Sequence, residues 1–109
     1  MTDGETRQKS SVAVSEQSAG RIVVTGELTF ATARDARQLG MAVLEGSSGQ
    51  TLVVDCKGVT RADSAGLAVL LDWLAWGRRK SRSLTLENLP DSLVAIARIS
   101  EVDALLKAG

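Results

Sequence analysis

Hydrophobic and polar positions alternate in two runs near the start of the chain, at residues 11–15 and 21–25. β-Branched residues are frequent in both runs, and the short segment 17–20 separates them. Alternation of this kind is typical of half-buried strands, and the short connection favours a hairpin. The pattern therefore predicts two antiparallel strands. Residues 1–10 precede them, are polar and charged without apolar periodicity, and are expected to form a disordered leader.

The next part of the chain has a helical period. Thr29 is a suitable N-cap residue, because its hydroxyl group can accept a hydrogen bond from a free backbone N–H. Side chains recur at helical spacing after it, at Phe30, Ala33, Arg37, Met41 and Leu44. The segment 46–49 is expected to end this helix. The continuous apolar run 52–54 then predicts a central strand that is reached by a right-handed crossover.

The second half of the chain repeats this order. A helix is predicted from Ser64 to about Trp76, with Gly77 just beyond its end. Its core face is expected to carry Leu67, Leu70, Leu71 and Leu74. Residues 83–87 alternate like a strand, and Pro90 begins a last helical region. The order β-β-α-β-α-β-α predicts an α/β fold, a small mixed β-sheet with helices packed on it, in one domain over residues 11–109.

A second apolar stripe lies on nearly the opposite side of the helix that begins at Ser64. It consists of Ala65, Val69, Trp73 and Trp76. A surface helix of a small domain is normally polar on that side, so the stripe needs an explanation. Either another helix of the same domain covers it, or it stays partly exposed and docks on a partner, since tryptophan is enriched at interface hot spots.

Composition narrows the possible functions. The 109 residues are 44% hydrophobic, enough for one compact domain with a core. Basic and acidic residues balance at 13 each, which disfavours nucleic-acid binding by charge alone. No apolar run approaches the length of a membrane-spanning helix, and the first residues do not form a signal peptide, so a cytoplasmic protein without direct membrane insertion is expected. Cys56 is the single cysteine and is interpreted as a small apolar residue behind a strand.

The sequence offers little catalytic chemistry. It contains no histidine and no tyrosine, no phosphate-binding glycine loop and no carboxylate cluster at metal-ligand spacing. Ser64 therefore has no obvious base, and the chain is predicted not to be an enzyme and to need no cofactor or metal. Asp63 and Ser64 open a helix where free N–H groups favour negative charge. Such a serine can cap the helix, accept a phosphoryl group, or lie at the centre of a docking surface.

The same residues carry a family resemblance. The run 52–55, then Val59, then 63–71 resembles the signature of STAS domains, the fold of bacterial anti-sigma-factor antagonists. Gly26-Glu27-Leu28 after a strand is a second matching piece, and the match in element order extends from Ser11 to Ala108. In the antagonists a partner kinase phosphorylates the serine that follows the aspartate, and the resemblance implies that Ser64 holds this position. A phosphate beside Asp63 would disrupt a docked interface by repulsion and desolvation.

Two features resemble a different branch of the family. The antagonists usually carry aspartate where this chain has Thr29, and segments 28–33 and 66–71 look more like MlaB, the cytoplasmic STAS subunit of the Mla phospholipid-trafficking ABC transporter. This resemblance implies a non-catalytic subunit that binds and supports an MlaF-like ATPase in a complex with a permease. Such a subunit would be peripheral to the inner membrane through its partner and would support outer-membrane lipid asymmetry.

The resemblance also implies where the partner binds. The expected partner-binding residues are Arg61, Asp63, Ser64, Ala65, Ala68, Val69, Asp72, Trp73 and Trp76. The alternative function is an anti-sigma-factor antagonist switched by phosphorylation of Ser64, with an anti-sigma-factor serine kinase as its partner. A small-ligand-binding STAS module is a third possibility, for which the sequence offers no pocket-forming polar set. Neighbouring genes, for a transporter or for a kinase, would separate the first two.

Overall fold

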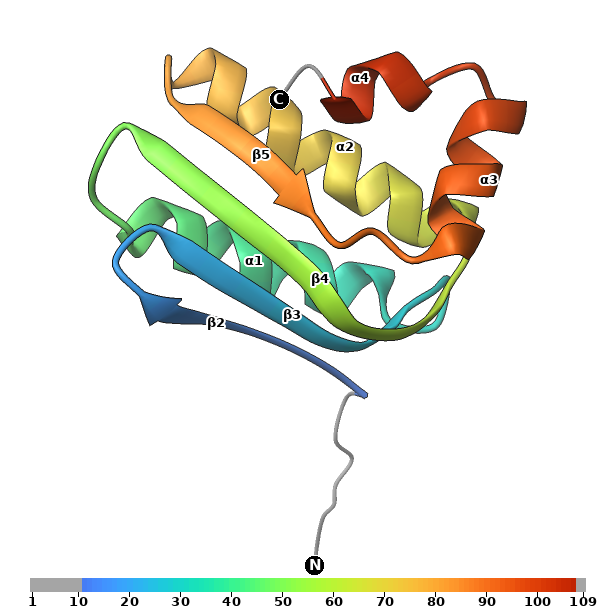
Figure 1. Cartoon of the computed structure of the whole chain (residues 1–109). Coiled ribbons are helices and arrows are strands. Elements are labelled where there is room, and N and C mark those ends of the chain that lie inside the picture. Colours follow the sequence, from blue (N-terminus) through green and yellow to red (C-terminus); the bar gives the residue numbers. More distant parts are fainter. Residues whose placement is uncertain (1–10, 108–109) are drawn as a thin grey trace, which may run out of the picture.

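The computed structural model describes residues 11–107 and contains a four-stranded sheet in the order β2-β3-β4-β5 (Figure 1). β2 is antiparallel to β3, and β3, β4 and β5 are parallel, so the predicted hairpin and mixed sheet are confirmed. β4 runs further than predicted, because β3 pairs with it as far as Leu28 and Ala62. The leader predicted at residues 1–10 lies outside the described residues. The strands are β2 Val12–Ser18, β3 Arg21–Leu28, β4 Thr51–Ala62 and β5 Ser83–Glu87.

Two long helices lie side by side against one face of this sheet, and two shorter helices follow β5 (Figure 1). Both shorter helices contact α2, and the last of them also contacts β5. Alternate strand residues point into the layer between sheet and helices, where Ile22, Val24, Leu52, Val54 and Leu84 are at most 1% exposed. The helices are α1 Ala33–Gly46, α2 Ser64–Arg79, α3 Asp91–Ile99 and α4 Asp103–Lys107.

The two apolar stripes of α2 are both covered. The leucine stripe faces the core as predicted, with Leu71 half-buried and its other members buried. The second stripe is buried too, because α1 packs over it: Val69, Trp73 and Trp76 are 3%, 0% and 3% exposed. The hypothesis that this tryptophan stripe stays exposed for a partner is therefore wrong, and the alternative, cover by another helix, is correct. Of the four stripe residues, Ala65 keeps partial exposure.

Helix α1 begins three residues later than the proposed Thr29 cap would place it. Its N-cap is Thr32, and residues 29–32 form a turn. The Thr32 hydroxyl donates to the carbonyl oxygen of Glu27 at 2.7 Å and accepts from the N–H of Thr29 at 3.0 Å. This local bonding competes with the first helical turn. As a consequence Phe30, expected on the buried helix face, is 86% exposed.

The ends of the later helices also differ from prediction. α2 continues to Arg79, and Gly77 lies inside it, where a Cβ atom would be only 3.1 Å from Cβ of Leu84. That glycine is used for close packing against β5 and does not terminate the helix. The last helical region is divided into α3 and α4, because Glu101 has φ of +61° and interrupts the helix.

The face of the sheet away from α1 and α2 carries an ionic network across three strands. Arg21 donates to Asp55 at 2.8 Å and to Glu87 at 3.0 Å. Asp55 also accepts from the side chain of Asn88 at 3.0 Å and from the N–H of Lys57 at 2.9 Å. The Asn88 amide, the Lys57 N–H and the Arg21 guanidinium lower the pKa of Asp55 more than burial raises it. These bonds tie β3, β4 and β5 together on their less covered side.

The contact between α1 and α2 depends on Gly40. A Cβ atom there would lie 2.1 Å from Cζ2 of Trp73. Gly40→Ala should therefore lower the free energy of unfolding by about 1–3 kcal/mol, the usual cost of overpacking a core. Gly46→Ala in the same helix is the matched control, because a Cβ atom would meet nothing within 4 Å there. Urea unfolding monitored by tryptophan fluorescence measures both, and equal midpoints would contradict this account of the packing.

Candidate partner-binding site

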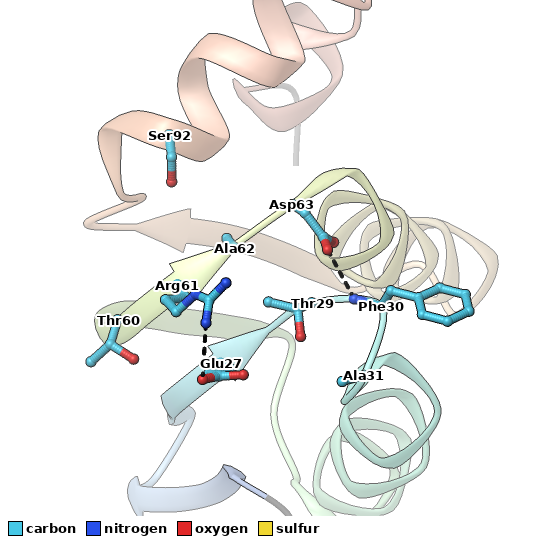
Figure 2. Close-up of a pocket in the computed structure, with 9 residues that line it drawn as sticks. All are labelled: Glu27, Thr29, Phe30, Ala31, Thr60, Arg61, Ala62, Asp63 and Ser92. Carbon is cyan, nitrogen blue, oxygen red and sulfur yellow. Dashed lines mark hydrogen bonds and ion pairs between the residues drawn. The ribbon is translucent and has the colours of Figure 1, made fainter.

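Asp63 joins three segments of the chain at one end of the sheet. It is the N-cap of α2, and its Oδ1 accepts hydrogen bonds from the N–H groups of Ala65 at 2.9 Å and Gly66 at 3.3 Å. Its Oδ2 accepts a third bond, at 3.0 Å, from the N–H of Phe30 in the turn after β3 (Figure 2). The prediction that residues 63–65 open a helix after a central strand is confirmed. The cap is the Asp63 carboxylate, and the Ser64 hydroxyl is left to face solvent.

The charge state of Asp63 follows from these contacts. Partial burial raises the pKa of its carboxyl group, but the N–H groups of Phe30, Gly66 and Ala65 and the positive charge of Arg61 together outweigh burial, so the pKa is lowered. Asp63 is therefore ionised at neutral pH. Its negative charge lies at the N-terminus of α2, where the helix dipole also favours it.

The start of α2 lies directly on the end of β3. A Cβ atom on Gly66 would be 2.0 Å from the carbonyl oxygen of Leu28, so this position requires glycine. The close approach places Ser64 and Phe30 next to the shared cap at Asp63. Ser64 is exposed, and its hydroxyl forms no hydrogen bond within residues 11–107. A side chain that does nothing for the fold is free to act on a partner.

A groove of about 640 Å³ runs between α1 and α2. Its α2 side is formed by the small side chains of Ala65 and Ala68, and an ion pair of 3.2 Å between Arg37 Nε and Asp72 Oδ2 crosses it. Both partners of that pair are largely exposed, so the pair contributes little to stability. The lining residues are Phe30, Ala33, Arg34, Arg37, Gln38, Ala65, Ala68, Val69 and Asp72.

A second, more polar depression of about 580 Å³ also has Phe30 in its lining (Figure 2). It is open to solvent and includes Glu27, Arg61, Asp63 and Ser92. Nη1 of Arg61 is 3.9 Å from Oε2 of Glu27, a loose ion pair in which the arginine is 75% exposed. Phe30 borders both hollows. We call a set of exposed or partly exposed residues at this end of α2, namely Phe30, Arg61, Ser64, Ala65, Ala68 and Asp72, the Ser64 surface.

The structure sorts the residues that the sequence proposed for partner binding. Arg61, Asp63, Ser64, Ala65, Ala68 and Asp72 lie together around the start of α2. Val69 lines the groove but is buried, and Trp73 and Trp76 lie under α1 or near the far end of α2. Sequence reasoning missed Phe30 and Arg37 as surface residues. The signal for Phe30 was the polar turn that holds it, Thr29 to Thr32, which was taken for the first turn of the helix.

Other chemistry is sparse in the described part of the chain. Residues 11–107 contain no group of three or more histidine, cysteine, aspartate or glutamate side chains that could hold a metal ion. Burial, with a smaller contribution from Asp55, raises the pKa of the Cys56 thiol to about 12, so it stays protonated and unreactive. No helix within the same residues has the length and apolar character needed to cross a membrane.

The lowered pKa of Asp63 predicts how stability depends on pH. Because the folded pKa lies below the unfolded value of about 3.9, the stabilisation is complete above that value and is lost as pH falls through the folded pKa. Asp63→Asn should therefore lose less unfolding free energy than wild type between pH 6 and pH 3. Asp35→Asn, at an exposed carboxylate without a hydrogen bond, is the control and should keep the wild-type slope. Urea titrations across this range measure it, and identical slopes in all the proteins would contradict the role of Asp63.

Comparison with known proteins agrees with this architecture. The structure of the anti-sigma factor antagonist SpoIIAA in its unphosphorylated form has a TM-score of 0.63 at 16% identity, over 85% of this chain and 83% of that one. The murine anion transporter Slc26a9 matches with a TM-score of 0.57 and 25% identity over 76% of this chain, which spans 14% of the transporter. No curated protein matches.

A family model identifies the domain type. The model, described as the MlaB STAS domain, matches residues 12–107 and so covers nearly all of the chain. The predicted STAS fold is thereby confirmed, in agreement with the likeness to SpoIIAA. STAS domains are generally non-catalytic domains that regulate or bind other proteins. The chain therefore belongs to the STAS domain family, in the group that the MlaB model describes.

Proposed function

We propose that this chain is a non-catalytic subunit that binds the ATPase of an Mla-type ABC transporter through the Ser64 surface. In this role it supports phospholipid trafficking and outer-membrane lipid asymmetry, in the cytoplasm and next to the inner membrane through the ATPase and its permease. The family model supports the MlaB branch. The observation that carries the binding role is the exposed ring of Phe30, on a turn that is bonded to Asp63 at the start of α2.

Phe30 has the properties of an interface anchor. An aromatic ring that is 86% exposed gains nothing from folding and gains most when a partner covers it. Its backbone N–H is held by Asp63, so the ring projects from a turn that is already ordered before binding. A pre-ordered contact loses less conformational entropy on association, which increases affinity.

The groove beside Phe30 supplies shape and charge. Small side chains at Ala65 and Ala68 leave room for a helix or loop of the partner to approach α2 closely. The exposed Arg37–Asp72 pair and the unpaired Arg34 provide charges at the rim, where they act on specificity and on the rate of association more than on affinity. The surface therefore combines an apolar centre with a polar rim, as protein interfaces do.

The alternative function, an antagonist switched by phosphorylation of Ser64, uses the same surface. Ser64 is exposed, so a kinase could reach its hydroxyl group, which favours this possibility. A phosphate there would add about −1.5 to −2 charges next to the ionised Asp63 and would oppose docking of an apolar partner. The two functions differ in the partner and in whether Ser64 is modified. Phosphopeptide mass spectrometry of the protein from its own cells would detect the modification that only the alternative requires.

Substitutions at Ser64 test whether the partner covers it. When the chain is co-expressed with the ATPase, Ser64→Glu should weaken association by about 3 kcal/mol or more, because an unpaired carboxylate would be buried at the contact. Folding should persist, since an acid at a helix N-terminus suits the dipole. Ser64→Ala should bind almost as wild type, because the hydroxyl makes no hydrogen bond in the free protein. Pull-down with thermal melts measures both, and full retention of the ATPase by Ser64→Glu would place the interface elsewhere.

Phe30→Ala tests the anchor directly. Loss of a hot-spot ring is expected to weaken ATPase binding by about 2 kcal/mol or more while the melting temperature stays near that of wild type. Ile99→Ala is the matched control, because this apolar side chain is 83% exposed, on α3, and lies outside the Ser64 surface. Affinity is measured by titration calorimetry with the purified ATPase. Equal affinities for the two variants would contradict the role of Phe30 as an interface anchor.

A further inference from the structure

The C-terminal end of α2 carries a concentration of positive charge that the proposed function does not use. Arg78, Arg79 and Lys80 are exposed, and Arg82 follows them after a short turn. No acidic residue occurs in the sequence between Asp72 and Glu87. Within residues 11–107, none of the four cations forms an ion pair with a carboxylate. We call these four residues the basic end.

Arg82 is a fixed cation with neutral partners. Its guanidinium donates to the carbonyl oxygens of Gly49 at 2.8 Å, Ser47 at 3.0 Å and Leu44 at 3.5 Å, and it lies over the Trp76 ring at 5.2 Å. None of these groups carries a negative charge, so the charge of Arg82 remains uncompensated.

The helix dipole explains only part of this arrangement. Cations in the last helical turn complement the negative end of the dipole, which accounts for Arg78 and Arg79. Arg82 lies beyond α2 and donates to carbonyl groups at the C-terminal end of α1, so the dipole of that helix accounts for its position. Each dipole carries only about half a negative charge at its C-terminal end, so the two dipoles do not neutralise four cations. Glu45 borders the same hollow as Lys80 and Arg82 but pairs with neither of them. The basic end therefore keeps a net positive charge.

The charge is polarised along α2. The helix has 16 residues, so the basic end is about 24 Å from Ser64, and the two ends of α2 lie at opposite ends of the sheet (Figure 1). Around the Ser64 end the acidic residues outnumber the basic ones in the elements that meet there. The acids are Glu27, Asp35, Asp63, Asp72 and Asp91, and the arginines are Arg34, Arg37 and Arg61. A molecule with no net charge but with its charges separated in this way is oriented by an anionic surface.

We propose that the basic end is an electrostatic contact surface for the anionic headgroups of a phospholipid bilayer. Guanidinium and ammonium groups suit phosphate oxygens, and a spread-out layer of headgroups needs no single enclosed seat. An acidic peptide seated in the hollow would meet the carboxylate of Glu45, which opposes it. Nucleic acid fits less well, because the aromatic ring at this end, Trp76, is 3% exposed and offers no face for stacking bases.

This contact is electrostatic and does not require insertion into the bilayer. The large exposed hydrophobic side chains within residues 11–107 are Phe30, Leu39, Ile99 and Leu105, and none of them belongs to α2 or to the turn after it. Binding should therefore be weak and strongly dependent on salt, since exposed charges are screened over about 10 Å at moderate ionic strength. The Ser64 surface, at the other end of α2, stays free for a protein partner.

Vesicle co-sedimentation tests the proposal with the full chain. Wild type should bind mixed vesicles of phosphatidylglycerol and phosphatidylcholine at low salt and should release them at high salt. It should not bind vesicles of phosphatidylcholine alone. The triple variant Arg78→Gln/Arg79→Gln/Lys80→Gln should bind on the order of 100-fold more weakly, since each cation near an anionic membrane contributes about fivefold. Arg82 is left unchanged because its hydrogen bonds hold the end of α1.

The matched control removes the same charge elsewhere. Arg34→Gln/Lys57→Gln/Arg98→Gln also removes three exposed, unpaired cations and should bind vesicles within a few-fold of wild type. Equal losses in both triple variants would mean that overall charge alone governs binding and would overturn the proposal, as would a wild type that does not sediment. Capture by polyglutamate beads without vesicle binding would assign the surface to an acidic protein segment and overturn it too. Ser64→Glu should still bind vesicles, which separates this result from the fate of the proposed function.

Discussion

The carboxylate of Asp63 holds together the end of the molecule where α2 begins. Its two oxygens accept three backbone N–H groups, two from the first turn of α2 and one from the turn after β3. These bonds connect the end of β4, the start of α2 and the segment that carries Phe30. Without them the turn that carries Phe30 would lose its side-chain bond to the start of α2.

The close packing at Gly66 depends on the same joint. A side chain there would collide with the carbonyl oxygen of Leu28, so α2 can begin against β3 only where the chain supplies a glycine. Asp63 and Gly66 therefore act together: one bonds the helix to the turn, and the other lets the helix approach the strand. The motif at residues 63–66 could be located from sequence because its geometry requires particular residue types: an acceptor side chain at the cap and glycine at the close approach.

Much of the fold followed from periodicity, and the errors have a common cause. Alternating and helical patterns predicted the strands, their order and the leucine face of α2, because burial on one side of an element leaves a regular trace. The helix ends predicted at Thr29 and Gly77 were wrong, because they rested on the residue types that commonly cap helices. In the structure the hydroxyl of Thr32 organises a turn first, and Gly77 serves packing against Leu84. Tertiary contacts decided both boundaries.

The tryptophan stripe shows that a helical pattern does not predict which element covers an apolar face. It identified residues that share a face of α2, but no periodicity within α2 could reveal that α1 covers them. The information lies in another helix, at Gly40, whose missing side chain makes room for Trp73. A glycine inside a helix costs about 1 kcal/mol relative to alanine, so its presence there is itself a sign of a large neighbour.

Stability and the proposed binding role belong to different residues of the same helix. Leu67, Leu70 and Trp73 are buried and hold α2 in place, whereas Ser64 and Ala68 point outward. Asp63 is committed to three backbone bonds and cannot change without loosening the joint. Ser64, one residue further on, is exposed, and its hydroxyl forms no hydrogen bond within the described chain, so a change there is expected to leave the fold intact.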